Sequence, residues 1–184
     1  MNKTISFLGK EIFYRVIGNS RPAVLVHGFG EVGEIWHNQA KFLQDKFKLI
    51  IPDLPGSGRS ELNHDMSMEG MAEAILAIMQ EEKCAPCPVI GHSMGGYITL
   101  ALAEKKPDVL TAFGLFHSSA FADSDEKKAT RQKGIAFIQQ HGAGEFLKTV
   151  TPNLFAPDSK TKIPELIQDL IEQGNNFTPQ SLVS

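Results

Sequence analysis

The sequence predicts an α/β fold in which helices flank a mostly parallel β-sheet, followed by an all-helical segment. Four short apolar runs are typical of strands that are buried on both faces, and they lie at 23–26, 49–51, 88–91 and 110–116. Helical patterns of about 10–15 residues separate these runs, and this alternation is typical of a parallel sheet. No strand-like run follows residue 121.

The N-terminal elements begin with two apolar runs, 4–8 and 11–17, on either side of Gly9-Lys10. A glycine-bearing turn between two such runs predicts an antiparallel hairpin. The first helix is predicted over 34–43, where apolar residues recur at helical spacings. These residues are Ile35, Trp36, Ala40 and Leu43.

A second helix is predicted over 67–82, with Ser67 as its N-cap and an apolar face formed by Met71, Ile75, Ile78 and Met79. A third helix, 94–104, is rich in Ala and Leu and ends before Pro107. We therefore expect a sheet-containing core over 1–121. The segment 122–184 is expected to be helical, with helices near 123–135, 145–150 and 163–173.

Composition limits the possible partners. Apolar residues make up 42% of the chain and charged residues 21%, which is typical of a soluble globular domain. The formal charge of −3 gives no reason to expect nucleic acid or an anionic membrane as a partner. Polar residues interrupt the N-terminal apolar runs, so we expect no signal peptide, no membrane span and a cytoplasmic protein.

Cys84 and Cys87 are the two cysteines of the chain. A C-x-x-C spacing can belong to a zinc or redox site, but zinc would need two further ligands, and no second pair or nearby histidine supplies them. A redox pair should open a helix after a strand, whereas Cys87 leads into an apolar run. We expect both cysteines to be structural and predict no metal site.

The segment Gly91-His92-Ser93-Met94-Gly95-Gly96 matches the pattern G-x-S-x-G between an apolar run and a helical pattern. In a sharp strand-to-helix turn, the serine hydroxyl projects from the carboxyl end of the strand beside a helix N-terminus. In open α/β sheets ligands bind at that edge. Ser93 is therefore the candidate catalytic nucleophile.

Acyl transfer also needs donors for the negative charge that develops on the carbonyl oxygen. The Met94 N–H, directly after Ser93, is one candidate, and the loop after an earlier strand should supply the second. That loop begins His27-Gly28-Phe29-Gly30, and we assign the second donor to the Phe29 N–H. His27 belongs to this loop and is expected to brace it rather than act as the general base.

A second glycine-rich segment, 53–60, reads D-L-P-G-S-G-R-S. A dinucleotide-binding G-x-G-x-x-G would need glycine at 61, where the chain has Glu61, and no helix is predicted to start there. The segment is instead expected to be a structural turn that shapes one wall of a pocket.

Together these motifs resemble the α/β-hydrolase superfamily, in particular its small esterases, haloperoxidase-like enzymes and C–C bond hydrolases. The resemblance covers residues 5–121, and 123–184 resemble the helical cap of such enzymes. It implies that Ser93 forms an acyl-enzyme with an ester-like or activated carbonyl of a small molecule, that Phe29 and Met94 form the oxyanion hole, and that no cofactor is needed.

The sequence departs from the family pattern after the sixth strand. The resemblance places the catalytic acid after a seventh strand and the histidine after an eighth, and neither strand is present. We therefore expect the chain by itself to be nearly inactive. Its exposed sheet edge should favour a homo-oligomer or a second chain. A shortened chain, a proteolytic product and one subunit of a larger assembly all fit this pattern.

The pocket around Ser93 is expected to include Gly28, Trp36, His117 and Phe121. Aromatic residues at these spacings are also typical of plain core, so an apolar acyl group is only a mild preference. Two other functions stay open: a ligand-binding protein with a hydrolase fold, and a lyase or perhydrolase of the same fold.

Overall fold

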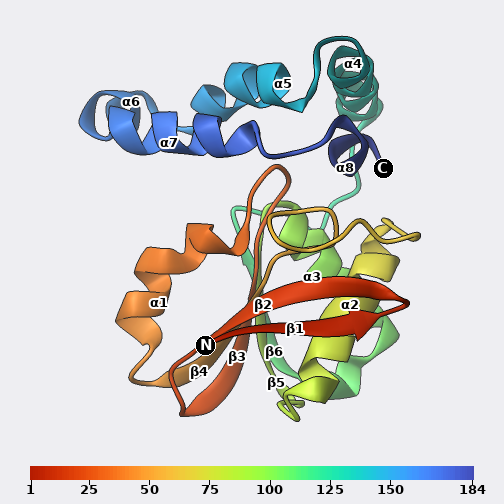
Figure 1. The fold of residues 1–184 in the computed structure, drawn as a ribbon, viewed down its shortest axis with the longest axis vertical. Coiled ribbons are helices and arrows are strands. Elements are labelled where there is room, and N and C mark those ends of the chain that lie inside the picture. Colours follow the sequence, from red (N-terminus) through yellow and green to blue (C-terminus); the bar gives the residue numbers. More distant parts are fainter. The chain divides into compact units, whose positions relative to one another are not determined.

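A computed structural model describes residues 1–184. The chain forms two compact units, Met1–Ala120 and Phe121–Ser184. The first contains the whole β-sheet, and the second is entirely helical (Figure 1).

The first unit is built on one six-stranded sheet with the strand order β1-β2-β4-β3-β5-β6. The strands are β1 (Asn2–Phe7), β2 (Lys10–Ile17), β3 (Arg21–Val26), β4 (Phe47–Pro52), β5 (Cys87–His92) and β6 (Leu110–Phe116). The predicted hairpin is confirmed, because β1 pairs antiparallel with β2. β2 is also antiparallel to β4, whereas the neighbours from β4 to β6 are parallel.

Helices cover both faces of this sheet (Figure 1). On one face α2 (Met68–Glu81) and α3 (Met94–Lys105) pack over Val24, Val26 and Ile50. On the other face η1 (Gly33–Trp36) and α1 (His37–Leu43) cover the alternate residues of the same strands. Because successive side chains of a strand point to opposite faces, strands buried on both sides have continuous apolar sequences.

The predicted helices agree with these elements, with one difference. Ser67 caps α2 by accepting a hydrogen bond from the Gly70 N–H at 3.0 Å, as expected. The predicted helix over 34–43 begins instead as the 3₁₀ turn η1 before α1. The Gly33 N–H at this turn donates to Asp53 Oδ1 at 2.9 Å. The side chain of Asp53, which directly follows β4, therefore takes part in starting η1. A second 3₁₀ turn, η2 (Pro107–Val109), joins α3 to β6.

The second unit contains five α-helices and one 3₁₀ turn. They are α4 (Asp125–His141), α5 (Ala143–Val150), η3 (Thr151–Leu154), α6 (Pro157–Lys162), α7 (Pro164–Gly174) and α8 (Pro179–Val183). α4 ends with Gly142 as its C-cap, and the φ of Gly142 is 90°. Ile138, Leu147, Ile167 and Leu182 are among its buried side chains. Nowhere in the chain is there a helix of sufficient length and apolarity to span a membrane.

A charged cluster ties the end of α2 to the antiparallel part of the sheet. The carboxylate of Glu82, whose side chain is 3% exposed, accepts hydrogen bonds from Lys3 Nζ and Tyr14 Oη, and it forms an ion pair with Lys48 Nζ. The lysine contacts are both 2.6 Å long and the tyrosine contact is 2.9 Å. Burial opposes ionisation, but these three donors outweigh it and lower the pKa of Glu82 from 4.5 to about 2.

This cluster predicts an acid-sensitive part of the stability. A carboxyl group with a lowered pKa in the folded state stabilises the protein above its unfolded pKa, and that contribution disappears as the pH falls from about 4.5 towards 2. Glu82→Gln should lower the free energy of unfolding at pH 7 by about 3 kcal/mol and flatten its dependence on pH in this range. Denaturant titrations at several pH values measure both effects. Glu81→Gln, at an exposed neighbouring position, is the control. If the free energy of unfolding depended on pH in the same way in both variants, the stabilising role of Glu82 would be contradicted.

Strand β6 forms one edge of the sheet, because it pairs only with β5. Phe113 on this strand is 53% exposed and Phe116 is 45% exposed. The association with another chain that such an edge favours stays a prediction.

Candidate active site

Ser93 lies at the junction of β5 and α3, where the backbone turns sharply from strand to helix. Its φ of 51° and ψ of −117° place it in a region that non-glycine residues rarely adopt. Such conformations cost about 1–3 kcal/mol and persist only when the surrounding structure enforces them. The strained strand–turn–helix that the motif predicts is therefore present at this residue.

Glycines allow the turn because backbone segments pass close to one another there. A Cβ on Gly91 would lie 2.5 Å from the Gly96 nitrogen and closer still to the Gly95 carbonyl oxygen. A Cβ on Gly95 would lie 2.5 Å from the His27 carbonyl oxygen, in the neighbouring loop after β3. The G-x-S-x-G spacing thus brings the start of α3 against both β5 and the loop after β3.

The chain segment that ends β6 holds the backbone of Ser93 in place. The Ser93 N–H donates to the Phe116 carbonyl oxygen at 3.0 Å, and the Ser118 hydroxyl donates to the Ser93 carbonyl oxygen at 2.7 Å. The Gly96 N–H also donates to the Ser93 carbonyl oxygen, at 3.0 Å. The strained conformation is therefore fixed from two sides, by α3 and by the end of β6.

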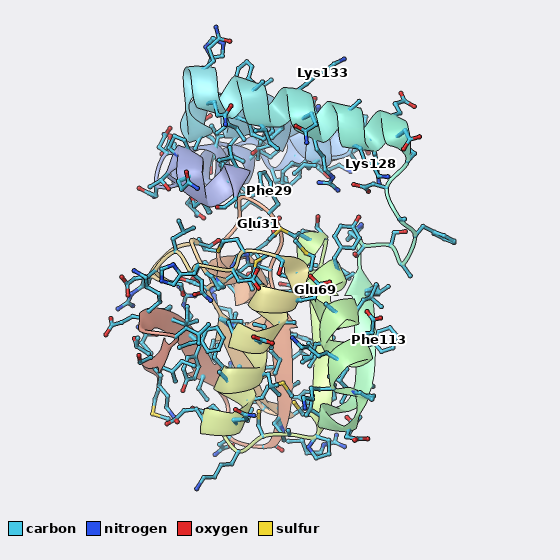
Figure 2. The ribbon with its side chains drawn as sticks, turned by 90° about the vertical axis from the view of Figure 1, so that its right-hand side faces the viewer. Phe29, Glu31, Glu69, Phe113, Lys128 and Lys133 are labelled. Atoms are coloured by element: carbon cyan, nitrogen blue, oxygen red, sulfur yellow. The ribbon has the colours of Figure 1, made fainter.

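The loop that follows β3 carries the predicted oxyanion donor. Phe29 and Glu31 are labelled on this loop in Figure 2, and Phe29 is 37% exposed. A Cβ on Gly28 would lie 3.0 Å from the Ser93 Cβ, so the start of this loop runs directly beside the serine. Met94 is the first residue of α3, where backbone N–H groups have no helical acceptor. The structure therefore places Gly28 and the first residue of α3 next to Ser93, and the oxyanion hole formed by the Phe29 and Met94 N–H groups stays a prediction.

His27 braces this loop from inside the protein, as expected. Its Nε2 accepts a hydrogen bond from the Leu54 N–H at 2.9 Å, so the ring proton is on Nδ1, which donates to the Gly28 carbonyl oxygen at 2.8 Å. Complete burial lowers the pKa of His27 and keeps the ring neutral. Both ring nitrogens are occupied, which excludes His27 as a base for Ser93 in this arrangement.

The 53–60 segment is a turn organised around the buried carboxylate of Asp53. Oδ1 accepts from Arg15 Nη1 at 3.0 Å and from the Gly33 N–H, and Oδ2 accepts from the Arg59 N–H at 3.1 Å. The Ser60 hydroxyl donates to the Asp53 carbonyl oxygen at 2.6 Å. No helix starts here, and the predicted structural turn is confirmed; its role as a pocket wall stays a prediction.

The other residues predicted for the pocket lie in different surroundings. Trp36 is 5% exposed and belongs to the core cluster under η1 and α1; its ring faces Phe116 at 5.9 Å between centroids. His117 is exposed, follows β6 at φ 48° and stacks edge-on against Phe116 at 4.7 Å. Phe121 begins the helical unit and is 87% exposed. Only Gly28 is placed directly against Ser93.

No histidine of the chain is hydrogen-bonded to the Ser93 hydroxyl. His92 Nδ1 is bonded to Glu31, and both nitrogens of His27 are used within the loop. His37 faces Glu34 at 3.4 Å. The site therefore holds a strained serine and adjacent backbone donors, without a bonded base.

Cys84 and Cys87 are both free and buried. The Cys84 thiol donates to the Met79 carbonyl oxygen at 3.5 Å. The interaction with Cys84, followed by burial, raises the pKa of the Cys87 thiol. No cluster of three or more potential metal ligands is formed anywhere in the chain. Both cysteines belong to the core packed under α2 and α3, the structural role expected for them.

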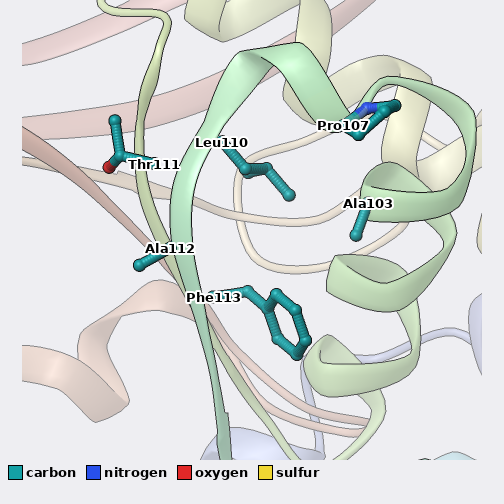
Figure 3. A pocket seen from close by; sticks show the side chains of 6 residues that line it. All are labelled: Ala103, Pro107, Leu110, Thr111, Ala112 and Phe113. Carbon is teal, nitrogen blue, oxygen red and sulfur yellow. The ribbon is translucent and has the colours of Figure 1, made fainter.

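An open groove of about 550 Å³ lies between α3, η2 and β6 (Figure 3). It is lined by Ala103, Pro107, Leu110, Thr111, Ala112 and Phe113. These residues lie towards the start of β6, whereas Ser93 follows the opposite, carboxyl end of the neighbouring parallel strand. The groove is therefore separate from the serine site.

Two side chains at the site were not singled out from the sequence. Glu31 Oε2 accepts from the Gly28 N–H at 2.7 Å and contacts His92 Nδ1 at 2.9 Å. Ser118 bonds the Ser93 backbone. The Glu31–His92 and Ser118–Ser93 contacts join segments far apart in the sequence, and neither Glu31 nor Ser118 belongs to a recognisable motif. The only available signal was position, because both residues follow strands whose carboxyl ends meet near Ser93.

A parallel-sheet fold with a strained serine between β5 and α3 defines a class of proteins with a nucleophile elbow. Residues 22–154 match the family model described as alpha/beta hydrolase fold. The chain belongs to this family, and the fold class predicted from the sequence is confirmed.

Similar proteins include several esterases. The chain is 32% identical over 136 residues to a pimeloyl-[acyl-carrier protein] methyl ester esterase of Aeromonas hydrophila, covering 72% of this chain and 52% of that protein. It is 33% identical over 108 residues to the lipase LipV of Mycobacterium tuberculosis, covering 58% of this chain and 41% of that one. The chain thus spans about half the length of the curated relatives it matches.

Solved structures agree with this fold over the whole chain. A thermophilic esterase from Thermogutta terrifontis matches 100% of this chain and 70% of its own length, with a TM-score of 0.89 and 27% identity. The enol-lactonase of Burkholderia xenovorans LB400 matches 98% of this chain and 70% of its own length, with a TM-score of 0.90 and 22% identity, which supports the fold alone.

Proposed function

We propose that the chain is the nucleophile-bearing part of a serine hydrolase that cleaves ester bonds in small molecules. The observation that carries this proposal is the backbone of Ser93, held at φ 51° and ψ −117° between a buried strand and a helix. Strained residues cluster at functional sites, where the surrounding structure enforces them. The similarity to proteins named esterases and lipases supports an ester as the substrate class.

The proposed chemistry is acyl transfer. Ser93 Oγ attacks the ester carbonyl carbon, its proton passes to a general base, and the carbonyl oxygen becomes an oxyanion. The N–H groups of Phe29 and Met94 stabilise that oxyanion, and each such donor is worth about 10²–10³ in rate. Collapse of the intermediate expels the alcohol, which takes up the proton, and leaves the acyl group on Ser93. Water then releases the acid by the same steps.

The general base is proposed to come from outside these 184 residues, from a longer chain or from a second chain. None of the six histidines is bonded to Ser93 Oγ, and a serine without its histidine loses about 10⁶ in rate. We therefore expect slow turnover from the chain alone. The strained turn at Ser93 is already formed. The slow turnover is therefore attributed to the lack of a general base beside Ser93.

The test is covalent labelling with an excess of a fluorophosphonate, followed by peptide mass spectrometry. We expect a slow but selective adduct on Ser93, with exposed serines such as Ser124 unmodified. Ser93→Ala should abolish the adduct, and p-nitrophenyl esters should yield both acid and alcohol wherever turnover is detected. The proposal fails if Ser93 reacts no faster than the exposed serines, since that result would favour a ligand-binding protein of the same fold. Products other than acid and alcohol would favour a lyase or perhydrolase.

A further inference from the structure

We infer that Glu31 is a positioning residue that locks the predicted oxyanion loop to the nucleophile elbow. This inference rests on the proposed function and identifies the side chain that keeps the two halves of that site in register. Glu31 belongs to the loop after β3, and His92, the residue directly before the nucleophile, belongs to β5. The carboxylate of Glu31 bonds both the loop and the strand.

The carboxylate bridges two donors from different segments with a single oxygen. Oε2 accepts from the Gly28 N–H at 2.7 Å and contacts His92 Nδ1 at 2.9 Å. The side chains of Glu31 and His92 are only 16% and 19% exposed, so the bridge is largely shielded from water. Charge-assisted hydrogen bonds of this kind are stronger than neutral ones. A shielded bridge therefore fixes the distance between the loop and the strand.

The position of the bridge makes it relevant to catalysis. A Cβ on Gly28 would lie 2.9 Å from Glu31 Oε2 and 3.0 Å from the Ser93 Cβ, so the bridged peptide lies directly beside the nucleophile. Since the Gly28 N–H donates to Glu31, it is not available to an oxyanion. The next N–H along the loop is that of Phe29, the donor predicted from the sequence. Holding Gly28 in this way fixes where the Phe29 peptide lies relative to Ser93.

The bridge also determines the tautomer of His92, that is, which of its two ring nitrogens carries the proton. An ionised carboxylate only accepts hydrogen bonds, so His92 Nδ1 must carry a proton. In the neutral ring, Nε2 is then the unprotonated nitrogen. The ring centroids of Trp36, Phe116 and His117 lie 6.3, 6.0 and 6.2 Å from that of His92. A fixed tautomer is therefore a direct signature of the bridge and does not depend on enzymatic turnover.

Three variants separate positioning from simple folding. Glu31→Ala removes both contacts, whereas Glu31→Gln keeps an oxygen that can accept from the Gly28 N–H. Glu34→Gln is the matched control, because Glu34 lies three residues further along the same segment, is 50% exposed and pairs with Arg15 and His37 instead. Thermal unfolding of each variant verifies that it is folded before its reactivity is compared.

The first measurement is the initial rate at which a fluorophosphonate modifies Ser93. We expect Glu31→Ala to lower this rate by about 10- to 100-fold, up to the effect of losing one oxyanion donor. Glu31→Gln should recover most of the loss, and Glu34→Gln should stay within about twofold of the wild type, as expected for a residue outside the site. A folded Glu31→Ala variant with the wild-type rate would overturn the inference.

The second measurement uses NMR and needs no reaction. In the wild type, ¹⁵N shifts should report a protonated Nδ1 on His92, and the Gly28 amide should be protected from hydrogen exchange. Glu31→Ala should remove both signatures, while Glu31→Gln should retain protection of the Gly28 amide. Unprotonated Nδ1 in the wild type would overturn the bridge itself.

The two measurements distinguish the failure of this inference from the failure of the proposed function. If Ser93 is not labelled selectively in the wild type, the hydrolase proposal fails, while the NMR signatures still test the bridge. If Ser93 is labelled selectively and the Glu31 variants react like the wild type, only the positioning role is refuted.

Discussion

Gly91→Ala is expected to lower the free energy of unfolding by about 3 kcal/mol, the upper part of the range for overpacked interiors. The added methyl would lie 2.5 Å from the Gly96 nitrogen and closer to the Gly95 carbonyl oxygen. Both atoms belong to the backbone at the start of α3, so no side-chain rotation can relieve the contact. Either α3 moves away from β5 or the turn at Ser93 opens, and the selective labelling of Ser93 should be lost in both cases.

Gly114→Ala is the matched control for this prediction. Gly114 pairs with Ile90 on the neighbouring strand, and its added methyl would meet Ile90 Cγ1 at 3.3 Å, a side-chain atom. We expect a change of less than about 1 kcal/mol, because side chains can adjust by a few tenths of an ångström. Urea titrations followed by circular dichroism measure both values. Equal destabilisation of the two variants would show that the close approach at Gly91 is not what constrains the elbow.

Asp53→Ala is expected to cost about 3–5 kcal/mol, as does removal of one partner from a buried ion pair. The carboxylate is 1% exposed and serves three donors from separate segments: Arg15, the Gly33 N–H and the Arg59 N–H. Alanine would leave these donors without their acceptor and would detach η1 and the 53–60 turn from β4. Near-ultraviolet circular dichroism of Trp36, at the end of η1, should report the loss of local order.

The control for Asp53 is Asp45→Ala, at an exposed position between α1 and β4. It should change the free energy of unfolding by no more than about 0.5 kcal/mol, as is usual for surface positions. Guanidinium titrations of the two variants and the wild type give the comparison. An Asp53→Ala protein as stable as the Asp45 control would contradict the central role of this carboxylate in the turn.

The elements of the sheet and the position of Ser93 could be predicted because local patterns encode them. Residues 23–26 are apolar on both faces of the strand, and in the structure Val24 and Val26 face one core while Ala23 and Leu25 face the other. The glycines around Ser93 are likewise a local signal, since the strand, the turn and the helix are consecutive in the sequence. The 3₁₀ start of the 34–43 segment was missed, because the Gly33 N–H bonds a carboxylate 20 residues away.

The contacts that support the site could not be predicted in the same way. Glu31 meets His92 across 61 residues, and Ser118 meets Ser93 across 25. Such pairs depend on the strand order β4-β3-β5-β6, which local periodicity does not determine. Trp36 illustrates the opposite case. Its spacing is compatible with a pocket or with core, and only the packed structure shows that it is 5% exposed.

The attachment of Ser93 to the end of β6 links the backbone conformation of the serine to the stability of an edge strand. Two hydrogen bonds of its backbone lead to Phe116 and Ser118, and β6 has a neighbour on one side only. Edge strands open more readily than central ones, and opening here would release the serine from its strained conformation. By thermodynamic linkage, a partner that pairs only with the closed form of β6 is expected to stabilise the strained backbone of Ser93, and a ligand that binds only this backbone conformation is expected to strengthen that pairing by the same free energy.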